Sequence, residues 1–204
     1  MNTRLVWNFE INNDKPLAWP AAESSSVDDI RWESRFFWPG STIITLNGLD
    51  DTFLELSRYQ VKHRQDSYYL LADEDYNLKT RHEHLLYKPI IKKTEHAVAY
   101  GKKLNLAEQS PDSLLPGHET LTAKTLLHLI RTRGKKIHVE KEALIYKFAT
   151  TPVTKLEFAR LTVKNKTYFS VSIESRAIAW IELLTQHLLG KEISCDYVTF
   201  LKTI

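Results

Sequence analysis

The segment from residue 30 to residue 38 alternates between two kinds of side chain. The two sets are Ile30, Trp32, Ser34, Phe36 and Trp38, and Arg31, Glu33, Arg35 and Phe37. A period of two is typical of a β-strand, in which successive side chains point to opposite faces of a sheet. Large aromatic rings on an exposed sheet would promote aggregation. We therefore expect both faces of this strand to be covered.

Charged residues also occupy alternate positions in other strand-like segments. They are Arg31, Glu33 and Arg35 in the segment above, then Lys79 and Arg81, Lys88, Lys141, and Glu174. In an open sheet, these side chains would face water. In a barrel wide enough for a ligand, one face of each strand points inward, so the same pattern would line a charged cavity. The pattern alone leaves both arrangements open.

The remaining periodicities predict the other elements. Strands are expected over residues 4–11, 67–72, 76–81, 85–91, 135–148, 155–163, 166–175 and 197–201. Helices are expected over residues 49–56, 121–130 and 177–188, and Gly134 and Gly190 end the last two. Residues 12–29 contain prolines and serines and predict an irregular loop. This order predicts one α+β domain over residues 1–204 with a mostly antiparallel sheet or barrel.

Composition sets limits on the compartment and the partners. A chain of 204 residues can bury a core without disulfide bonds, and its one cysteine, Cys195, cannot form one internally. This predicts a reducing, cytoplasmic compartment. No apolar run is long enough for a signal peptide or a membrane span, so no membrane partner is expected. The formal net charge of +3 is small for a nucleic-acid-binding protein.

Several common catalytic motifs are absent from the sequence. The six glycines are not spaced as in a P-loop or a dinucleotide-binding fingerprint. The sequence also lacks the G-x-S-x-G elbow of serine hydrolases and the H-E-x-x-H motif of zinc hydrolases. These absences weigh against acyl transfer and zinc-dependent hydrolysis.

Segments spread over most of the chain, taken in order, resemble the CYTH superfamily, also called triphosphate tunnel metalloenzymes. The first is I-R-W-E-S-R-F at residues 30–36, which is similar to the family's E-x-E-x-R-F. The next are R-x-D-x-Y-Y-L at 64–70, L-K-x-R at 78–81, Y-K at 87–88, H-V-E-K at 138–141, L-E-F at 156–158, residues 170–174, and S-x-x-Y-x-x-x-L at 194–201.

The resemblance implies an eight-stranded antiparallel β-barrel that forms a tunnel with flanking helices. Arginine and lysine would bind the phosphates of a triphosphate, and these residues are Arg35, Lys79, Arg81, Lys88 and Lys141. Glu33 and Glu174 would be the catalytic carboxylates that hold Mg²⁺ or Mn²⁺, with Glu157 as a third metal ligand.

The sequence departs from the family pattern at three positions. Arg31 and Ser172 stand where the family has acidic residues, and Ala143 stands where it usually has arginine. The loss of two carboxylates weakens a metal site. Arg31 could instead bind phosphate directly or pair with Glu33, and either arrangement permits binding without hydrolysis.

Two function classes follow from this pattern, with a third that is weaker. The first is metal-dependent hydrolysis of a nucleoside triphosphate, inorganic triphosphate or thiamine triphosphate. The second is binding of a phosphorylated small molecule or polyphosphate without turnover, in a degenerate tunnel. The third is RNA binding on an open basic sheet, which the low net charge disfavours. Metal dependence separates the first two classes.

Overall fold

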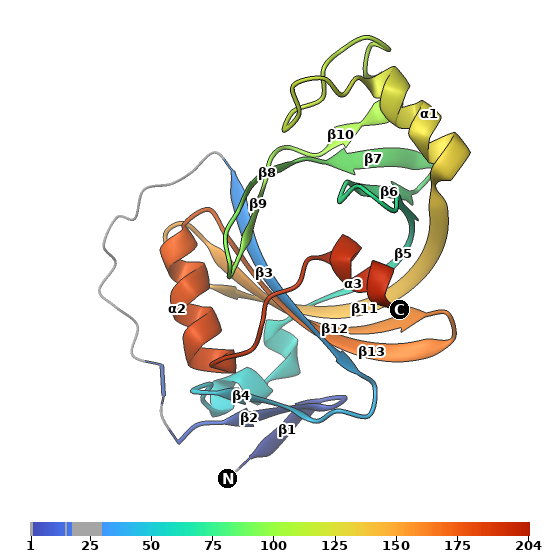
Figure 1. Ribbon diagram of the computed structural model, residues 1–204. Coiled ribbons are helices and arrows are strands. Elements are labelled where there is room, and N and C mark those ends of the chain that lie inside the picture. The colour runs from blue at the N-terminus through green and yellow to red at the C-terminus, as the bar shows by residue number, and fades with distance from the viewer. Residues whose placement is uncertain (1, 15, 18–29) are drawn as a thin grey trace.

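The computed structural model describes residues 2–14, 16–17 and 30–204 (Figure 1). Its main sheet has ten strands. They are β3 (Arg31–Pro39), β5 (Gln60–Leu70), β6 (Asn77–Arg81), β7 (His84–Lys88), β8 (Ile90–Lys93), β9 (Val98–Tyr100), β10 (Leu104–Asn105), β11 (Lys135–Phe148), β12 (Thr154–Val163) and β13 (Lys166–Ser175). Neighbouring strands are antiparallel, in the order β10-β7-β6-β5-β11-β12-β13-β3-β9-β8. The sheet curls into a half-barrel, which together with the helices confirms the α+β class.

The chain passes directly between the two ends of this strand order. Pro89 joins β7 to β8, and residues 101–103 join β9 to β10. The Gly101 N–H donates to the Pro89 carbonyl at 3.0 Å, so the paired ribbon continues through the bend. Proline has no N–H to donate to a neighbouring strand. Pro89 therefore separates β7 from β8, although the two strands follow each other in sequence. The sheet therefore has ten strands rather than the eight expected.

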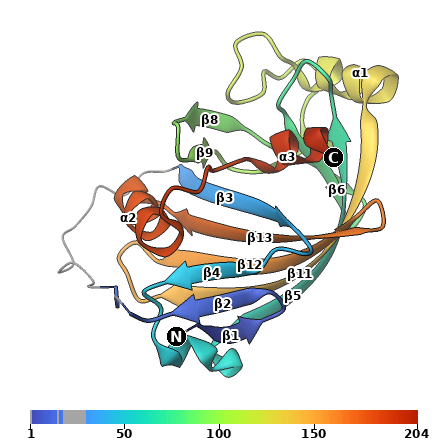
Figure 2. The same cartoon turned by 60° about the horizontal axis from the view of Figure 1, so that its bottom comes forward.

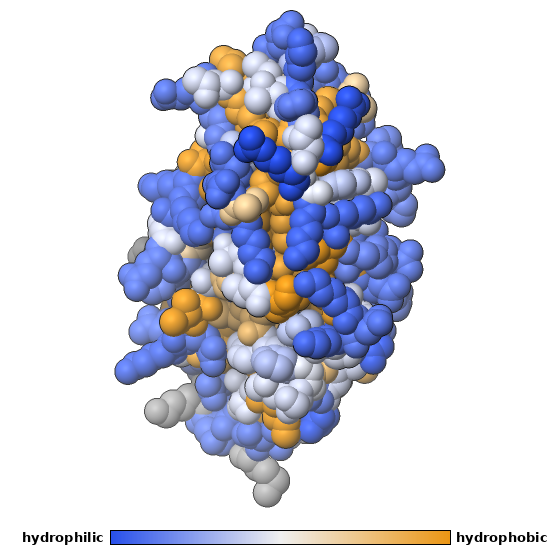
Figure 3. Space-filling model, turned by 45° about the vertical axis from the view of Figure 1, so that its right-hand side comes forward, coloured by the Kyte–Doolittle hydropathy of each residue, from blue (hydrophilic) through white to orange (hydrophobic). Residues whose placement is uncertain are grey.

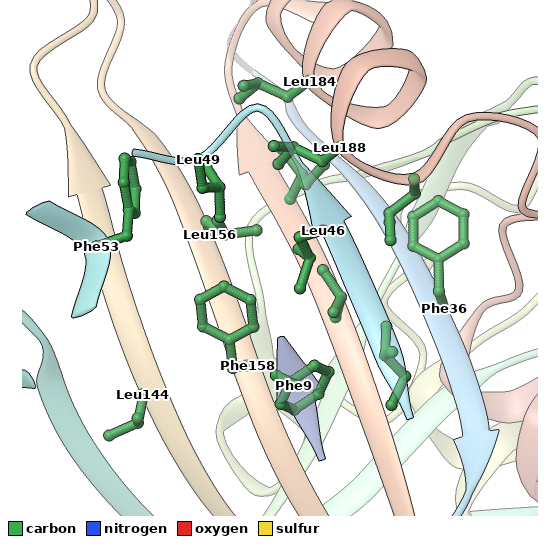
Figure 4. Packing of buried hydrophobic residues seen from close by; sticks show 14 of the residues in the cluster. Phe9, Phe36, Leu46, Leu49, Phe53, Leu144, Leu156, Phe158, Leu184 and Leu188 are labelled. Carbon is green, nitrogen blue, oxygen red and sulfur yellow. The ribbon is translucent and has the colours of Figure 1, made fainter. Parts of the chain in front are cut away.

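A second layer covers the convex face of the half-barrel. It consists of a small sheet of β1 (Thr3–Val6), β2 (Phe9–Asn12) and β4 (Ile44–Asn47), together with α2 (Ile178–Leu189) (Figure 2). Phe9 and Leu46 of the small sheet pack with Phe158 of β12 in this core (Figure 4). Trp32 and Phe36 of β3 lie in the same core and are 3 % and 1 % exposed, so the predicted covering of this face is confirmed.

A third group of elements closes the end of the sheet near β6 and β7. Helix α1 (Ala123–Arg133) begins after Thr122, whose hydroxyl accepts from the Thr125 N–H, and ends at Gly134 as predicted. Its apolar residues Leu126 and Ile130 pack in a separate core with the strands of this end.

The helix expected over residues 49–56 is present as two short 3₁₀ turns, η1 (Asp51–Leu54) and η2 (Leu56–Arg58). A third such turn is η3 (Leu106–Glu108).

The last element lies on the concave side of the sheet. The prediction of a strand over residues 197–201 is wrong, because this segment forms the helix α3 (Tyr197–Thr203). Asp196 caps the helix by accepting the Thr199 N–H at 2.9 Å. Tyr197 and Leu201 are four residues apart, which places both on one helix face, and they pack against concave side chains of β5, β11 and β12. Helix α3 therefore fills one part of the half-barrel and leaves the other part to charged residues.

The predicted loop over residues 12–29 lies mostly outside the described residues. Asn12 is the last residue of β2, and residues 13–14 and 16–17 have no helix or strand. Residues 15 and 18–29 lie outside the description. Among the described residues, no helix is long and apolar enough to cross a membrane. The face in Figure 3 carries mostly hydrophilic side chains, with a narrow hydrophobic strip along its centre.

Candidate functional site

The concave face of the curled sheet encloses a cavity of about 890 Å³. All nine residues that the sequence predicts for the site line this cavity. They are Arg31, Glu33, Arg35, Lys79, Arg81, Lys88, Lys141, Glu157 and Glu174. The structure thus brings together residues that are up to 143 positions apart in the chain, and it places them in a cavity rather than on an open sheet.

The register of the central strands aligns these side chains in rows. Glu33 of β3 lies directly opposite Glu174 of β13, and Arg35 lies opposite Ser172. Ser172 is in turn opposite Glu157 of β12. Because side chains alternate along each strand, the residues next to these positions on β3, β12 and β13 point to the opposite, convex face and its core. Two carboxylates side by side would repel each other, so this arrangement requires cations nearby.

Arg35 is the centre of the most buried ion-pair network, and only 7 % of its surface is exposed. Its Nε donates to Glu33 Oε1 at 2.9 Å, and its Nη1 donates to Glu157 Oε1 at 3.1 Å. Lys88 Nζ donates to the second oxygen of Glu33 at 3.1 Å, and Lys141 Nζ donates to Glu157 at 2.8 Å. Each glutamate is therefore held by two cations.

These contacts control the ionisation of the network. Burial alone would raise the pKa of both glutamates, because it disfavours the charged form. The cations outweigh this effect: they lower the pKa of Glu157 to about 2 and bring the pKa of Glu33 well below its ordinary value. The pKa of Arg35 is raised, because its two carboxylate partners outweigh burial. Both glutamates and Arg35 are therefore charged at neutral pH, whereas burial lowers the pKa of Lys141.

A second network joins β5 and β6. Arg81 donates to both oxygens of Asp66, at 2.6 and 2.5 Å, and Lys79 Nζ donates to Asp66 Oδ2 at 2.9 Å. The Asp66 pKa is lowered to about 2, because these bonds outweigh burial. The Lys79 pKa is lowered to about 7, because burial outweighs the attraction of Asp66 and nearby Arg81 opposes a second charge.

Glu174 forms a third and more exposed network. It pairs with Lys155 at 2.8 Å and with Arg31 at 3.4 Å. Arg31 therefore pairs with Glu174 and not with Glu33. Ala143, at a position where the resemblance to the CYTH superfamily leads one to expect arginine, is fully buried and packs in the core beneath α3. That position belongs to the core rather than to the charged wall.

The cavity wall has further cations that the sequence interpretation did not assign to the site. They are Lys62, Arg64, Lys102, Lys103, Lys147, Lys155 and Arg176. Strand β5 begins at Gln60, seven residues before the predicted start, so the alternation of Lys62 and Arg64 was not recognised as part of a strand. The first half of β5 also has polar residues, His63 and Gln65, at the positions between these cations. This part of the strand therefore has no apolar face, and its sequence shows no amphipathic pattern.

Three tyrosine rings also line the cavity, and each is covered by a cation of the protein. Lys88 Nζ lies 3.6 Å from the ring centre of Tyr100. Lys79 Nζ lies 5.1 Å from the centre of the Tyr68 ring, and the Arg35 guanidinium lies 5.1 Å from that of Tyr197. The rings of Tyr68 and Tyr197 also stack on each other, with centres 4.9 Å apart. The rings thus support the cations that face the cavity.

The carboxylates do not fit a preformed site for Mg²⁺ or Mn²⁺. A hard divalent cation is bound by several oxygen ligands, usually carboxylates. Here Glu33, Glu157 and Glu174 each contact two Lys or Arg groups, whose charges oppose a metal ion. Among the residues that the structure describes, no three Asp, Glu, His or Cys side chains form a group that could hold a metal. The arrangement suits an anion.

Comparison with known proteins does not assign a function to this chain. No family model matches the sequence, and no curated protein matches it.

Proposed function

We propose that this protein is a CYTH-like tunnel protein that binds a triphosphate or another polyphosphate-containing ligand in its cationic cavity. The observation that carries the proposal is the convergence of cations from six strands, β3, β5, β6, β7, β11 and β12, on one cavity. Arginine pairs with phosphate oxygens through two parallel hydrogen bonds, and lysine adds a compact charge. Low solvent exposure strengthens these interactions.

The proposal favours binding without hydrolysis. Metal-dependent hydrolysis needs carboxylates that are free to hold Mg²⁺ or Mn²⁺, and the three glutamates of the cavity are held by cations. RNA binding on an open sheet is less well supported, because the cations face a cavity. A phosphate-release assay with each metal separates binding from hydrolysis.

Thermal unfolding in the presence of phosphate ligands tests the proposal. A ligand at about 100 times its Kd adds about 2.7 kcal/mol to the folded state, which for a chain of this size raises Tm by about 5–10 °C. We expect tripolyphosphate to produce such a shift at low salt, and Arg81→Ala to reduce it. Arg133→Ala is the matched control, because Arg133 is exposed on α1 and does not line the cavity. The absence of any shift with tripolyphosphate, pyrophosphate and nucleoside triphosphates would disprove the proposal.

Lys79 predicts that ligand binding is coupled to proton uptake. Its pKa of about 7 in the free protein means that it is partly neutral at pH 7–8, and a bound anion favours the charged amine and raises this pKa. The protein should therefore take up to about one proton on binding, and its affinity should fall as pH rises above 7. Calorimetry in buffers of different ionisation enthalpy measures the uptake. Lys79→Arg, which stays charged, should abolish it, whereas an unchanged uptake in this variant would contradict the assignment.

A further inference from the structure

The cavity wall carries far more positive than negative charge. Among the described residues, thirteen Lys and Arg side chains line it. Three glutamates of the wall and Asp66, which pairs with Lys79 and Arg81, oppose them, so the excess is nine when Lys79 is charged. Seven of these cations form ion pairs with Glu33, Asp66, Glu157 or Glu174. The other six form no ion pair within the described part of the chain: Lys62, Arg64, Lys102, Lys103, Lys147 and Arg176.

The unpaired cations lie close enough to repel one another. Burial lowers the pKa of Lys62, and the charges of Arg64, Lys155 and Lys147 lower it further. The pKa of Lys103 is lowered in the same way, first by burial and then by Arg81 and Arg64. A polyanion would relieve this repulsion. A triphosphate carries only about four to five charges at neutral pH, given that a terminal phosphate with a second pKa near 6 carries about −1.5 to −2.

Among the described residues that line the cavity, the aromatic rings offer little surface to a nucleobase, since Tyr68, Tyr100 and Tyr197 are only 3 %, 2 % and 6 % exposed. Stacking on a ring face is the usual way in which proteins hold a base without reading its edges. The rings of Tyr68, Tyr100 and Tyr197 each have a cation of the protein near one face, and those of Tyr68 and Tyr197 are stacked together. The wall therefore favours phosphate groups over an aromatic moiety.

The volume of the cavity agrees with a ligand larger than a triphosphate. Ligand pockets of about 300–1,000 Å³ bury drug-sized molecules, and this cavity of about 890 Å³ lies in the upper part of that range. The excess of nine positive charges corresponds to about five or six phosphomonoester groups at about −1.5 to −2 each, and to a longer chain for a linear polyphosphate, whose internal phosphates carry about one charge each. The cavity is therefore large enough for a ligand of that charge.

We infer that the preferred ligand of the cavity carries about six or more phosphate groups and no aromatic base, since its wall has an excess of nine positive charges and its tyrosine rings are buried. This inference rests on the proposed function and makes it more specific. Two sources share this chemistry: a linear inorganic polyphosphate, and a polyol whose hydroxyl groups are all phosphorylated.

Competition binding at neutral pH and physiological salt tests the inference. The probes are tripolyphosphate, linear hexapolyphosphate, inositol hexakisphosphate and ATP. At least one six-phosphate probe should bind about tenfold or more tightly than tripolyphosphate, which corresponds to only 1.4 kcal/mol. The tighter of the two identifies the source. ATP should bind no more tightly than tripolyphosphate, because the tyrosine rings of the wall are buried and offer its base little surface.

Variants of the unpaired cations connect the effect to this wall. Lys62 and Lys147 lie near each other on β5 and β11, and the double change Lys62→Gln with Lys147→Gln should reduce the preference for six phosphates over three about tenfold. Lys166→Gln is the control, because Lys166 is exposed and lies outside the cavity wall. Affinity that stops rising at three phosphates, or tighter binding of ATP, would overturn the inference and leave the proposed function intact. If no probe binds, the proposed function itself is wrong.

Discussion

Replacing Arg35 by methionine is expected to lower the free energy of unfolding by about 3–5 kcal/mol, the usual cost of removing one partner from a buried ion pair. The arginine is the only cation shared by Glu33 and Glu157, with contacts of 2.9 and 3.1 Å within the described structure. Without it, each glutamate keeps a single lysine partner in a buried site. Chemical denaturation at pH 7 measures the loss, and Arg31→Met on the same strand is the control. Because Arg31 is half exposed, its loss should cost no more than about 1 kcal/mol.

The pH dependence of the Arg35→Met variant provides a second measurement. The pKa of Glu157 is about 2 in the folded protein and about 4.5 when unfolded, so its ion pairs stabilise the wild type above pH 4.5 and this contribution is lost as pH falls towards 2. The variant lacks much of this contribution. The two proteins should therefore differ most near pH 7, and the difference should shrink as pH falls towards 2 and Glu157 takes up a proton. A difference that does not change with pH would show that Arg35 contributes through packing rather than through charge.

The sequence predicted the parts of the fold that depend on local alternation. Strands β11, β12 and β13 begin and end within one residue of the expected positions, and β3 directs Trp32 and Glu33 to opposite faces as its pattern requires. Alternation also identified eight of the nine predicted residues that line the cavity, because inward-facing charge repeats with a period of two, and the ninth, Glu157, came from the family resemblance. These features need only the geometry of a strand.

The rest depends on contacts between distant segments. Tyr197 and Leu201 satisfy a strand pattern and a helix pattern equally well in so short a segment, and the cap at Asp196 and the concave surface beneath it favour the helix. The first half of β5 has polar side chains on both faces, so its Lys62 gave no sign of facing a cavity. The pairing of Arg35 with Glu157 and of Lys88 with Glu33 could not be inferred either, since it depends on how far the sheet curls.

The largest expected change in activity comes from placing acidic residues at the two positions where the CYTH pattern that the sequence resembles has them. We expect the wild type to release little or no phosphate from triphosphates, and the double variant Arg31→Glu with Ser172→Glu to show Mn²⁺-dependent release. The increase should be at least about tenfold, the factor that corresponds to 1.4 kcal/mol of transition-state stabilisation. The assay is phosphate release from tripolyphosphate and ATP, with Mn²⁺, with Mg²⁺ and with a chelator.

The register of β3 and β13 gives the physical reason for this expectation. Position 31 is two residues from Glu33 on β3, and position 172 is two residues from Glu174 on β13, so both new carboxylates would join the pair that already faces across the strands. Arg31→Glu also removes one of the two cations that hold Glu174. More carboxylates and less opposing charge favour a hard divalent ion next to the phosphates. Arg31→Gln with Ser172→Gln is the matched control, because it removes the arginine without adding acid. Strong turnover by the wild type that falls in the Glu variant would show instead that the natural site holds its metal through other groups, with Glu157 the first candidate.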